Sequence, residues 1–130
     1  MAYIKLFFAV GDSEVSESPS QLNPVAFSLR ADLNEEGAPI RLYAMADVGY
    51  SVANTVVSLT GSSSTKWQFA PDATGIPGTW ETYGNPLSLG TVGNGAGKVY
   101  FHARAKATSD ETPVNDTNVI INLAGVASAL

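Results

Sequence analysis

The chain contains no cysteine among its 130 residues. This absence excludes disulfides, thiolate metal sites and cysteine nucleophiles together, and it suits a protein that folds in a reducing cytosol. At this length, a single domain buries about two-thirds of the surface that its unfolded chain exposes, so its core needs no covalent reinforcement. We expect one domain that spans residues 1–130.

Long apolar runs are also missing. The longest one near the N-terminus is Leu6 to Val10, whereas a signal peptide has an apolar region of about 7–15 residues and a membrane span needs about 20. We therefore predict a first β-strand within residues 1–10, synthesis in the cytoplasm without a signal peptide, and no membrane partner. Export of such a chain would occur by cell lysis or inside an assembly.

Charge is sparse. Only 15% of the residues are charged, against about a quarter in an average domain. The net charge is −5, and the seven Lys and Arg residues form no cluster along the sequence. A nucleic-acid binder has a basic stripe, so we expect no nucleic-acid partner. The acidic excess favours solubility, and a surface poor in charge suits a protein packed against partners.

No segment has sustained helical periodicity, and alternation of period two takes its place. Residues 99–107 are the clearest case, with an apolar row, Val99, Phe101, Ala103, Ala105 and Ala107, and a polar row, Tyr100, His102, Arg104 and Lys106. Such alternation predicts a strand with one buried and one solvent-exposed face. Similar patterns predict strands at 3–10, 25–30, 40–48, 55–60, 66–70, 87–89 and 118–123.

Glycine and proline separate these segments every 8–15 residues, which is typical of a β-sandwich. We predict an all-β fold, a two-layer antiparallel immunoglobulin-like sandwich of about 7–9 strands. Its expected core is Phe27, Leu29, Leu42, Trp67, Phe69, Phe101, Val119, Ile121 and Leu123. Residues 70–86 form the longest irregular stretch, which suggests a functional loop or the covering of a sheet edge. The small apolar tail, residues 124–130, either extends the last strand or docks on a neighbouring subunit.

The residue types that carry catalysis are scarce. His102 is the only histidine, and local spacing indicates neither a nucleophile nor a carboxylate to orient it, as a catalytic histidine requires. We expect a plain surface histidine, no zinc site, no catalytic residue and no enzyme activity.

Two acidic segments invite a comparison with calcium sites. Residues 32–37 resemble the start of a calcium-binding loop, but the twelfth position is Tyr43 instead of a bidentate Glu, so we favour a β-turn. The second segment carries Asp110, Glu111, Asn115 and Asp116. It could supply about four of the six to eight oxygens that calcium needs, and we favour hydrogen bonds that cap the loop. We predict no metal and no cofactor.

Aromatic and apolar clusters are the best candidates for contacts. We expect Trp67 in the core. We favour Trp80 and Tyr83 as interface or loop-anchoring residues, because Trp and Tyr are enriched at interfaces, over a role in stacking on sugars. Leu6, Phe7 and Phe8 are consecutive, so the first strand is apolar on both faces. We therefore predict that residues 1–10 contact a neighbouring subunit and can be deleted without unfolding the domain.

A longer pattern resembles small immunoglobulin-like structural proteins of tailed bacteriophages. It comprises Trp67-x-Phe69-Ala70-x-Asp72, Gly75-x-x-Gly78-Thr79-Trp80, Leu87-x-Leu89-Gly90, Tyr100-Phe101-x-x-Arg104-Ala105 and Asp116-Thr117-x-Val119. The resemblance covers residues 25–125 and implies a part of a capsid, neck or tail, located in the virion. We expect a non-enzymatic structural or decoration protein that forms a homo-oligomer and docks on other virion proteins. The alternative is a carbohydrate-binding module that uses Trp80 and Tyr83.

Overall fold

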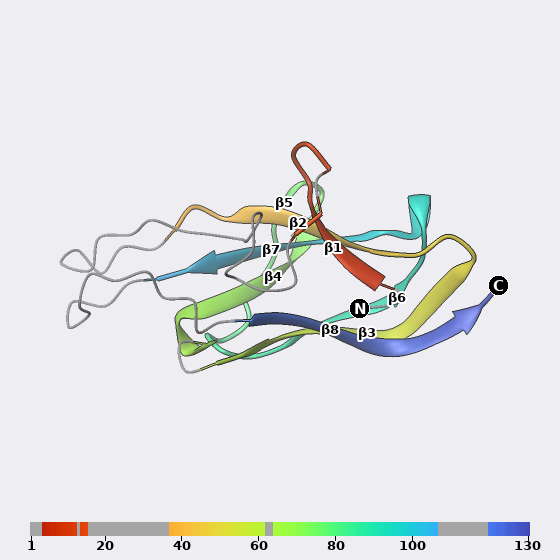
Figure 1. Ribbon diagram of the computed structural model, residues 1–130. Helices are drawn as coiled ribbons and strands as arrows, with labels where there is room; N and C mark the ends of the chain where they lie inside the picture. The colour runs from red at the N-terminus through yellow and green to blue at the C-terminus, as the bar shows by residue number, and fades with distance from the viewer. Residues whose placement is uncertain (1–3, 13, 16–36, 62–63, 107–119) are drawn as a thin grey trace.

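The computed structural model describes residues 4–12, 14–15, 37–61, 64–106 and 120–130. These residues form eight β-strands and two short 3₁₀ turns, η2 (Ser64–Lys66) and η3 (Gly95–Gly97). The strands make two antiparallel sheets that pack as layers (Figure 1). The all-β expectation is confirmed for this part of the chain. None of the described segments is a helix long and apolar enough to cross a membrane.

The larger sheet has five strands in the order β1 (Ile4–Phe8), β2 (Ile40–Ala46), β7 (Val99–Ala105), β4 (Trp67–Ala73) and β5 (Ile76–Pro77). Its register places Leu42 opposite Phe101 and Phe69 opposite Ala103. Residues directly opposite each other in an antiparallel pair share a face, so the apolar rows of β2, β7 and β4 all point the same way. We call the other face, which points away from the second sheet, the outer face.

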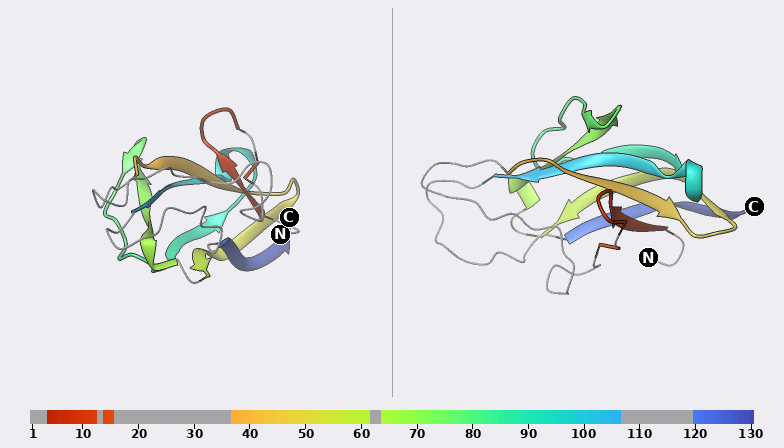
Figure 2. Two further views of the ribbon diagram at one scale, coloured as in Figure 1. Left: turned by 60° about the vertical axis from the view of Figure 1, so that its left-hand side comes forward. Right: turned by 90° about the horizontal axis from the view of Figure 1, so that it is seen from above.

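The smaller sheet has three strands in the order β6 (Leu87–Val92), β3 (Tyr50–Thr60) and β8 (Ile120–Ala129). Irregular register interrupts β3 near Asn54, which has a positive φ of 53°. The hydroxyl of buried Thr55 donates to the carbonyl of Val52 at 3.0 Å and so satisfies a backbone group at this bulge. Both views in Figure 2 show this sheet lying across the first one.

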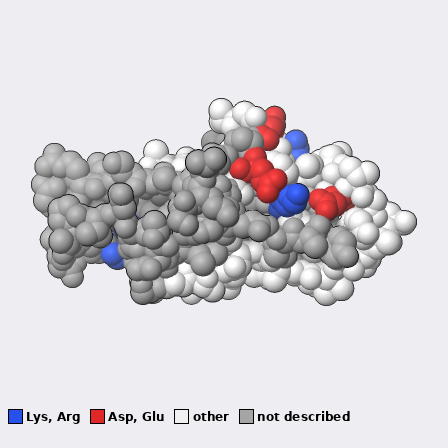
Figure 3. Space-filling view, in the orientation of Figure 1, with Lys and Arg blue, Asp and Glu red and all other residues white. Residues whose placement is uncertain are grey.

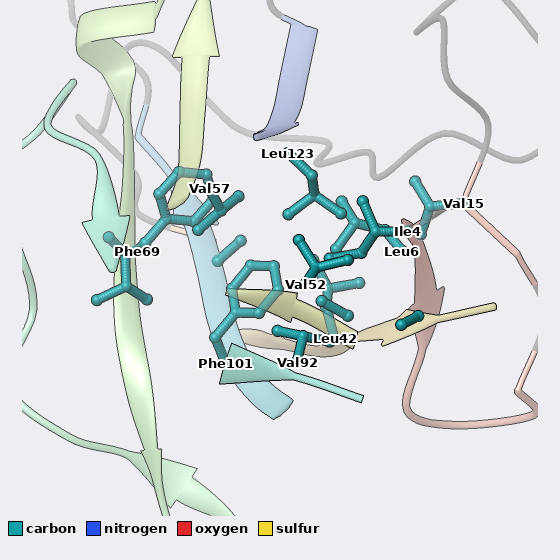
Figure 4. Close-up of a cluster of buried hydrophobic side chains, with 14 residues drawn as sticks. Ile4, Leu6, Val15, Leu42, Val52, Val57, Phe69, Val92, Phe101 and Leu123 are labelled. Atoms are coloured by element: carbon teal, nitrogen blue, oxygen red, sulfur yellow. The ribbon is translucent and has the colours of Figure 1, made fainter. Parts of the chain in front are cut away.

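The core fills the space between the sheets (Figure 4). The five-stranded sheet contributes Ile4, Leu6, Leu42, Ala44, Ala46, Phe69, Phe101 and Ala103, and the three-stranded sheet contributes Val52, Val57, Leu87, Val92 and Leu123. The Phe69 and Phe101 rings meet edge to face at 5.7 Å between centroids, a favourable aromatic geometry. Of the predicted core residues, Trp67 is only half-buried and Ile121 packs at the margin. Phe27, Leu29 and Val119 lie outside the described residues.

Several strands extend beyond their predicted bounds. β3 begins at Tyr50, five residues before the predicted start, and β4 continues to Ala73. β6 passes through Gly90, which takes a φ of 73°. β8 runs to Ala129, so the tail extends the last strand. The predicted strand at 25–30 lies outside the described residues.

The long loop predicted at residues 70–86 covers a sheet edge. After β4, the Thr74–Gly75 turn leads into β5, and the chain then runs back beside β4. Three backbone hydrogen bonds fasten it there, from the N–H groups of Gly78, Glu81 and Gly84 to the carbonyls of Pro71, Phe69 and Trp67, at 2.7, 2.8 and 2.7 Å. This segment therefore satisfies backbone groups that the edge of β4 would otherwise leave open.

Candidate functional site

His102 lies on the outer face, but it is not a surface histidine, because it is only 3% exposed. The register of β4 and β7 places Ala70 opposite His102, so Asp72, two residues further along β4, lies on the same face. The Nε2 atom of His102 is 2.8 Å from Oδ1 of Asp72. The expectation of an exposed, unpartnered histidine was wrong.

Asp72 collects further donors around its carboxylate. Arg41, opposite His102 on β2, donates from Nε to Oδ1 at 3.1 Å and from Nη2 to Oδ2 at 3.2 Å. The N–H of Gly75, in the turn after β4, donates to Oδ2 at 3.3 Å. The hydrogen bonds from Arg41 lower the pKa of Asp72; burial opposes this effect, and the contacts with His102 and Gly75 support it.

The carboxylate of Asp72 has a hydrogen-bond partner at every position that these neighbours can reach. Each carboxylate oxygen of Asp72 already has two partners, and its depressed pKa makes the group a weak base near neutral pH. Among the described residues, the side-chain hydrogen bonds given for Asp72 and His102 join them to each other, to Arg41 and to Gly75. The geometry suits a set of charge-assisted hydrogen bonds that holds β2, β7 and β4 together.

Rings and cations continue across the outer face toward β1. The guanidinium of Arg41 lies 3.9 Å from the ring centroid of Tyr100. The ammonium of Lys98 lies 4.6 Å from the ring of Tyr43 and 5.5 Å from that of Tyr100. Phe7 stacks on Tyr43 with ring centroids 5.1 Å apart. Each such cation–ring contact is worth roughly 0.5–2 kcal/mol, depending on exposure.

Tyr43 is buried although it belongs to the outer face. Its hydroxyl donates to Oδ1 of Asp12 at 3.0 Å, which provides the partner that a buried phenol needs. Burial raises the pKa of Tyr43, and the hydrogen bond to the Asp12 carboxylate raises it further. The middle of the outer face is therefore a second, polar and aromatic packing layer and not the solvent-exposed face that the alternation predicted.

Trp80 and Tyr83 anchor the loop on the same face. The Arg104 guanidinium lies 4.1 Å from the Trp80 ring and the Lys106 ammonium 4.2 Å from the Tyr83 ring. Gln68, which is buried, donates to the carbonyl of Glu81 at 2.9 Å and accepts from Nε of Arg104. Both rings are half-buried, and each has a cation against one face.

The fold gathers cations that are dispersed in the sequence. Lys5, Arg41, Lys98, Arg104 and Lys106 come from three different strands or their ends, and all five lie on the outer face. Lys and Arg residues that form no cluster along the sequence therefore lie on one face of the folded domain. Four of these cations contact rings, and Lys5 approaches the Glu14 carboxylate at 3.9 Å.

The N-terminal strand is part of the domain. Leu6 is 8% exposed and lies in the core beside Ile4. Phe8 packs against the margin of the core, and Phe7 stacks on Tyr43. The prediction that residues 1–10 can be deleted without unfolding conflicts with this placement, because the deletion would remove two core side chains.

The three-stranded sheet differs sharply from this face. None of the residues of β6, β3 and β8 is charged. At one end of the sheet, Val48, Val126 and Leu130 are exposed by 83%, 62% and 89%, and the Leu130 N–H donates to the carbonyl of Gly49 at 2.9 Å. Every residue from Ala124 to Leu130 is exposed. Figure 3 shows uncharged atoms over the end of the molecule where β8 finishes.

Comparisons with known proteins identify no family for this chain. No protein-family model, no curated protein and no solved structure matches the chain. Within the described segments, no group of three or more His, Cys, Asp or Glu residues could hold a metal ion. The acidic segments at 32–36 and 110–116 that we compared with calcium sites lie outside those segments.

Proposed function

We propose that this chain is a non-enzymatic structural protein that works by self-association and by docking onto other subunits of a larger assembly. The observation that carries the proposal is the complete lack of charge on β6, β3 and β8. Surfaces that remain in water usually have about 25–35% charged residues, whereas the centres of protein interfaces are depleted in charge. An uncharged sheet therefore fits a surface that a partner covers.

The outer face of the other sheet supports the same proposal. Three of its titratable groups, His102, Asp72 and Arg41, satisfy one another, so they stabilise the sheet. Catalytic groups usually stand within reach of a substrate atom. A rigid face and an uncharged face together describe a structural subunit better than an enzyme.

We extend the proposal to an immunoglobulin-like sandwich that is built into a bacteriophage particle. Support for this step comes from the residue pattern that runs from Trp67 to Val119. In the structure, the Gly75–Trp80 part of that pattern holds the turn and the loop anchor. The Tyr100–Ala105 part lies in the central strand of the larger sheet. Other virion proteins would then be the docking partners.

Light scattering coupled to size-exclusion chromatography tests self-association directly. We expect a discrete oligomer whose population rises with protein concentration, because mass action drives assembly. The purified chain should show this without an added ligand. A molar mass that stays at one chain up to the highest soluble concentration would contradict self-association.

The position of Trp80 and Tyr83 favours carbohydrate binding as a second candidate. The Trp80 ring lies against Arg104, and the Tyr83 ring lies against Lys106. These two cations are successive outward-facing residues at the C-terminal end of β7. A half-buried aromatic ring can still stack on a sugar, and the neighbouring cations would favour acidic sugars. Titration with soluble neutral and acidic polysaccharides tests this, with Trp80→Ala as the probe and Ile76→Ala, an exposed neighbour, as the control. Binding that survives Trp80→Ala would exclude the ring as a platform.

A further inference from the structure

The four edges of the two sheets are not equally protected. Proteins usually guard exposed edges with short strands, prolines, charges, bulges or a covering segment, since an open edge pairs with other chains. β1 is covered, because Val15 donates from its N–H to the carbonyl of Leu6 at 2.9 Å and Phe7 pairs with Glu14. On the far side, β5 has two residues, one of them Pro77, and residues 78–84 run beside β4.

The edges of the smaller sheet differ from each other. β6 has six residues, contains Gly90 at a positive φ, and pairs with β3 through an irregular register. β8 has ten residues without a charge or a proline, and it keeps its own alternation because the bulge lies in β3. Among the described edges, β8 alone has none of these protective features.

The end of β8 projects from the sandwich. Figure 1 and the right-hand view of Figure 2 both show its C-terminal end, together with the turn between β2 and β3, beyond the other strands. All side chains from Ala124 to Leu130 are exposed. Val126 and Leu130, four residues apart, share one face of the strand because side chains alternate.

The backbone polarity of this edge follows from one hydrogen bond. The N–H of Leu130 points to β3, where it meets the carbonyl of Gly49. Polar groups alternate in direction along a strand, so Ser128 and Val126 also direct theirs toward β3. Ala127 and Ala129 then direct their N–H and C=O groups to the open edge, and Ala127 is the midpoint of the exposed stretch 124–130.

We propose that β8 pairs antiparallel with β8 of a second copy of this chain, about a two-fold axis close to Ala127. Two three-stranded sheets then become one continuous sheet of six strands. This inference rests on the proposed self-association and names its contact. A two-fold interface brings the same patch together from both copies, so any charge in the patch would face its own sign.

β8 meets this condition because it contains no charged residue. With the axis at Ala127, Val126 lies opposite Ser128 of the second copy and Ala124 lies opposite its Leu130. None of these residues is charged, so the pairing has no like-charge cost. The exposed Val126 and Leu130 of this strand provide apolar surface that the second copy covers.

Two variants and a matched control test the contact. Val126→Lys places two ammonium groups diagonally across the axis, and Ala127→Pro removes the outward N–H while it leaves the bonds to β3 intact. Val10→Lys introduces the same charge at an exposed valine after β1. We expect the first two variants to be monomers at concentrations at which the wild type and Val10→Lys are dimers. A circular dichroism spectrum like that of the wild type and a cooperative thermal unfolding transition will show that the variants fold, whereas the unfolding temperature itself should fall as the dimer is lost.

A distance measurement identifies the strand independently. Because the chain has no cysteine, Ser128→Cys and Ser88→Cys accept a single nitroxide label each, on opposite edges of the same sheet. We expect strong dipolar broadening between labels at Ser128 and none at Ser88. If Val126→Lys and Ala127→Pro both remain oligomeric, and labels at Ser128 show no broadening, the β8 contact is wrong although the chain still self-associates. A wild-type chain that is monomeric throughout would overturn both.

Discussion

Replacing Asp72 by Asn should destabilise the fold measurably, because Asp72 joins three strands of the larger sheet. Oδ1 accepts from His102 and from Nε of Arg41, and Oδ2 accepts from Nη2 of Arg41 and from the N–H of Gly75. An Asn side chain keeps one acceptor oxygen and presents an NH₂ group in place of the other. Whichever way the amide is turned, two donors lose their acceptor.

The less costly orientation keeps the oxygen toward His102, whose side chain water hardly reaches. The NH₂ group then faces the N–H of Gly75, which is exposed, and Nη2 of Arg41, whose side chain is 35% exposed. Water compensates both in part, so we expect a loss of about 1–2 kcal/mol in the free energy of unfolding. For a domain of this size, that corresponds to a fall of about 3–8 °C in Tm.

The loss should depend on pH in one direction. The pKa of Asp72 is lowered in the folded state, chiefly by Arg41, so the folded chain binds fewer protons than the unfolded chain. The stabilisation is present above the ordinary aspartate pKa of about 3.9 and disappears as the pH falls through the lower folded pKa. Urea unfolding curves of the wild type and Asp72→Asn should therefore converge at acid pH and separate at neutral pH.

Asp47→Asn is the matched control, with the same change of charge in the turn between β2 and β3, and it should change the free energy of unfolding by less than about 0.5 kcal/mol. Equal stability of Asp72→Asn and the wild type at neutral pH would refute the view that this cluster ties the sheet together. A difference that grows toward acid pH would refute the assigned direction of the pKa.

Three further outcomes follow from the packing. Ile4→Ala should lower the free energy of unfolding in urea by about 2–4 kcal/mol because its side chain is buried in the core. Val10→Ala, at an exposed site, should have little effect. Equal effects of the two variants would contradict the burial of β1. Gly125→Ala should lower stability by about 1–3 kcal/mol, since its Cβ would lie 2.5 Å from Cγ1 of Val52, and Gly97→Ala, which meets open space, should be close to neutral in thermal melts. In an ultraviolet pH titration, the phenol that Tyr43→Phe removes should ionise above the ordinary tyrosine pKa of about 10, because burial and Asp12 raise the pKa of Tyr43; a lost signal at or below that value would contradict its burial.

The alternation of the sequence predicted the faces of the strands but not their partners. Leu42, Phe69, Phe101 and Leu123 are buried as expected, because period two alone decides which residues point inward. The contact of His102 with Asp72 depends on the register between β7 and β4, which are separated by about 30 residues. No local spacing encodes that register, so a histidine in a polar row was interpreted as exposed.

The apolar N-terminal strand shows a second limit. Leu6, Phe7 and Phe8 in succession indicate a strand with two apolar faces, and we interpreted the second face as an interface. In the structure, Phe7 has a partner in the same chain, the ring of Tyr43. The tail at 124–130 is less hydrophobic, yet it is the exposed segment. β1 and β8 are both edge strands, so burial depends on which edge another part of the chain covers, and composition does not contain that information.

The unequal distribution of charge between the two sheets gives them opposite responses to salt. Added salt screens the exposed Lys5–Glu14 contact on the larger sheet, and the buried contacts of Asp72 much less, within a Debye length of about 8 Å at physiological ionic strength. The uncharged smaller sheet has nothing to screen, and sulfate or phosphate ions strengthen the burial of its apolar groups because they are excluded from protein surfaces. Concentrated salt should therefore loosen one layer of the domain slightly while it promotes assembly through the other.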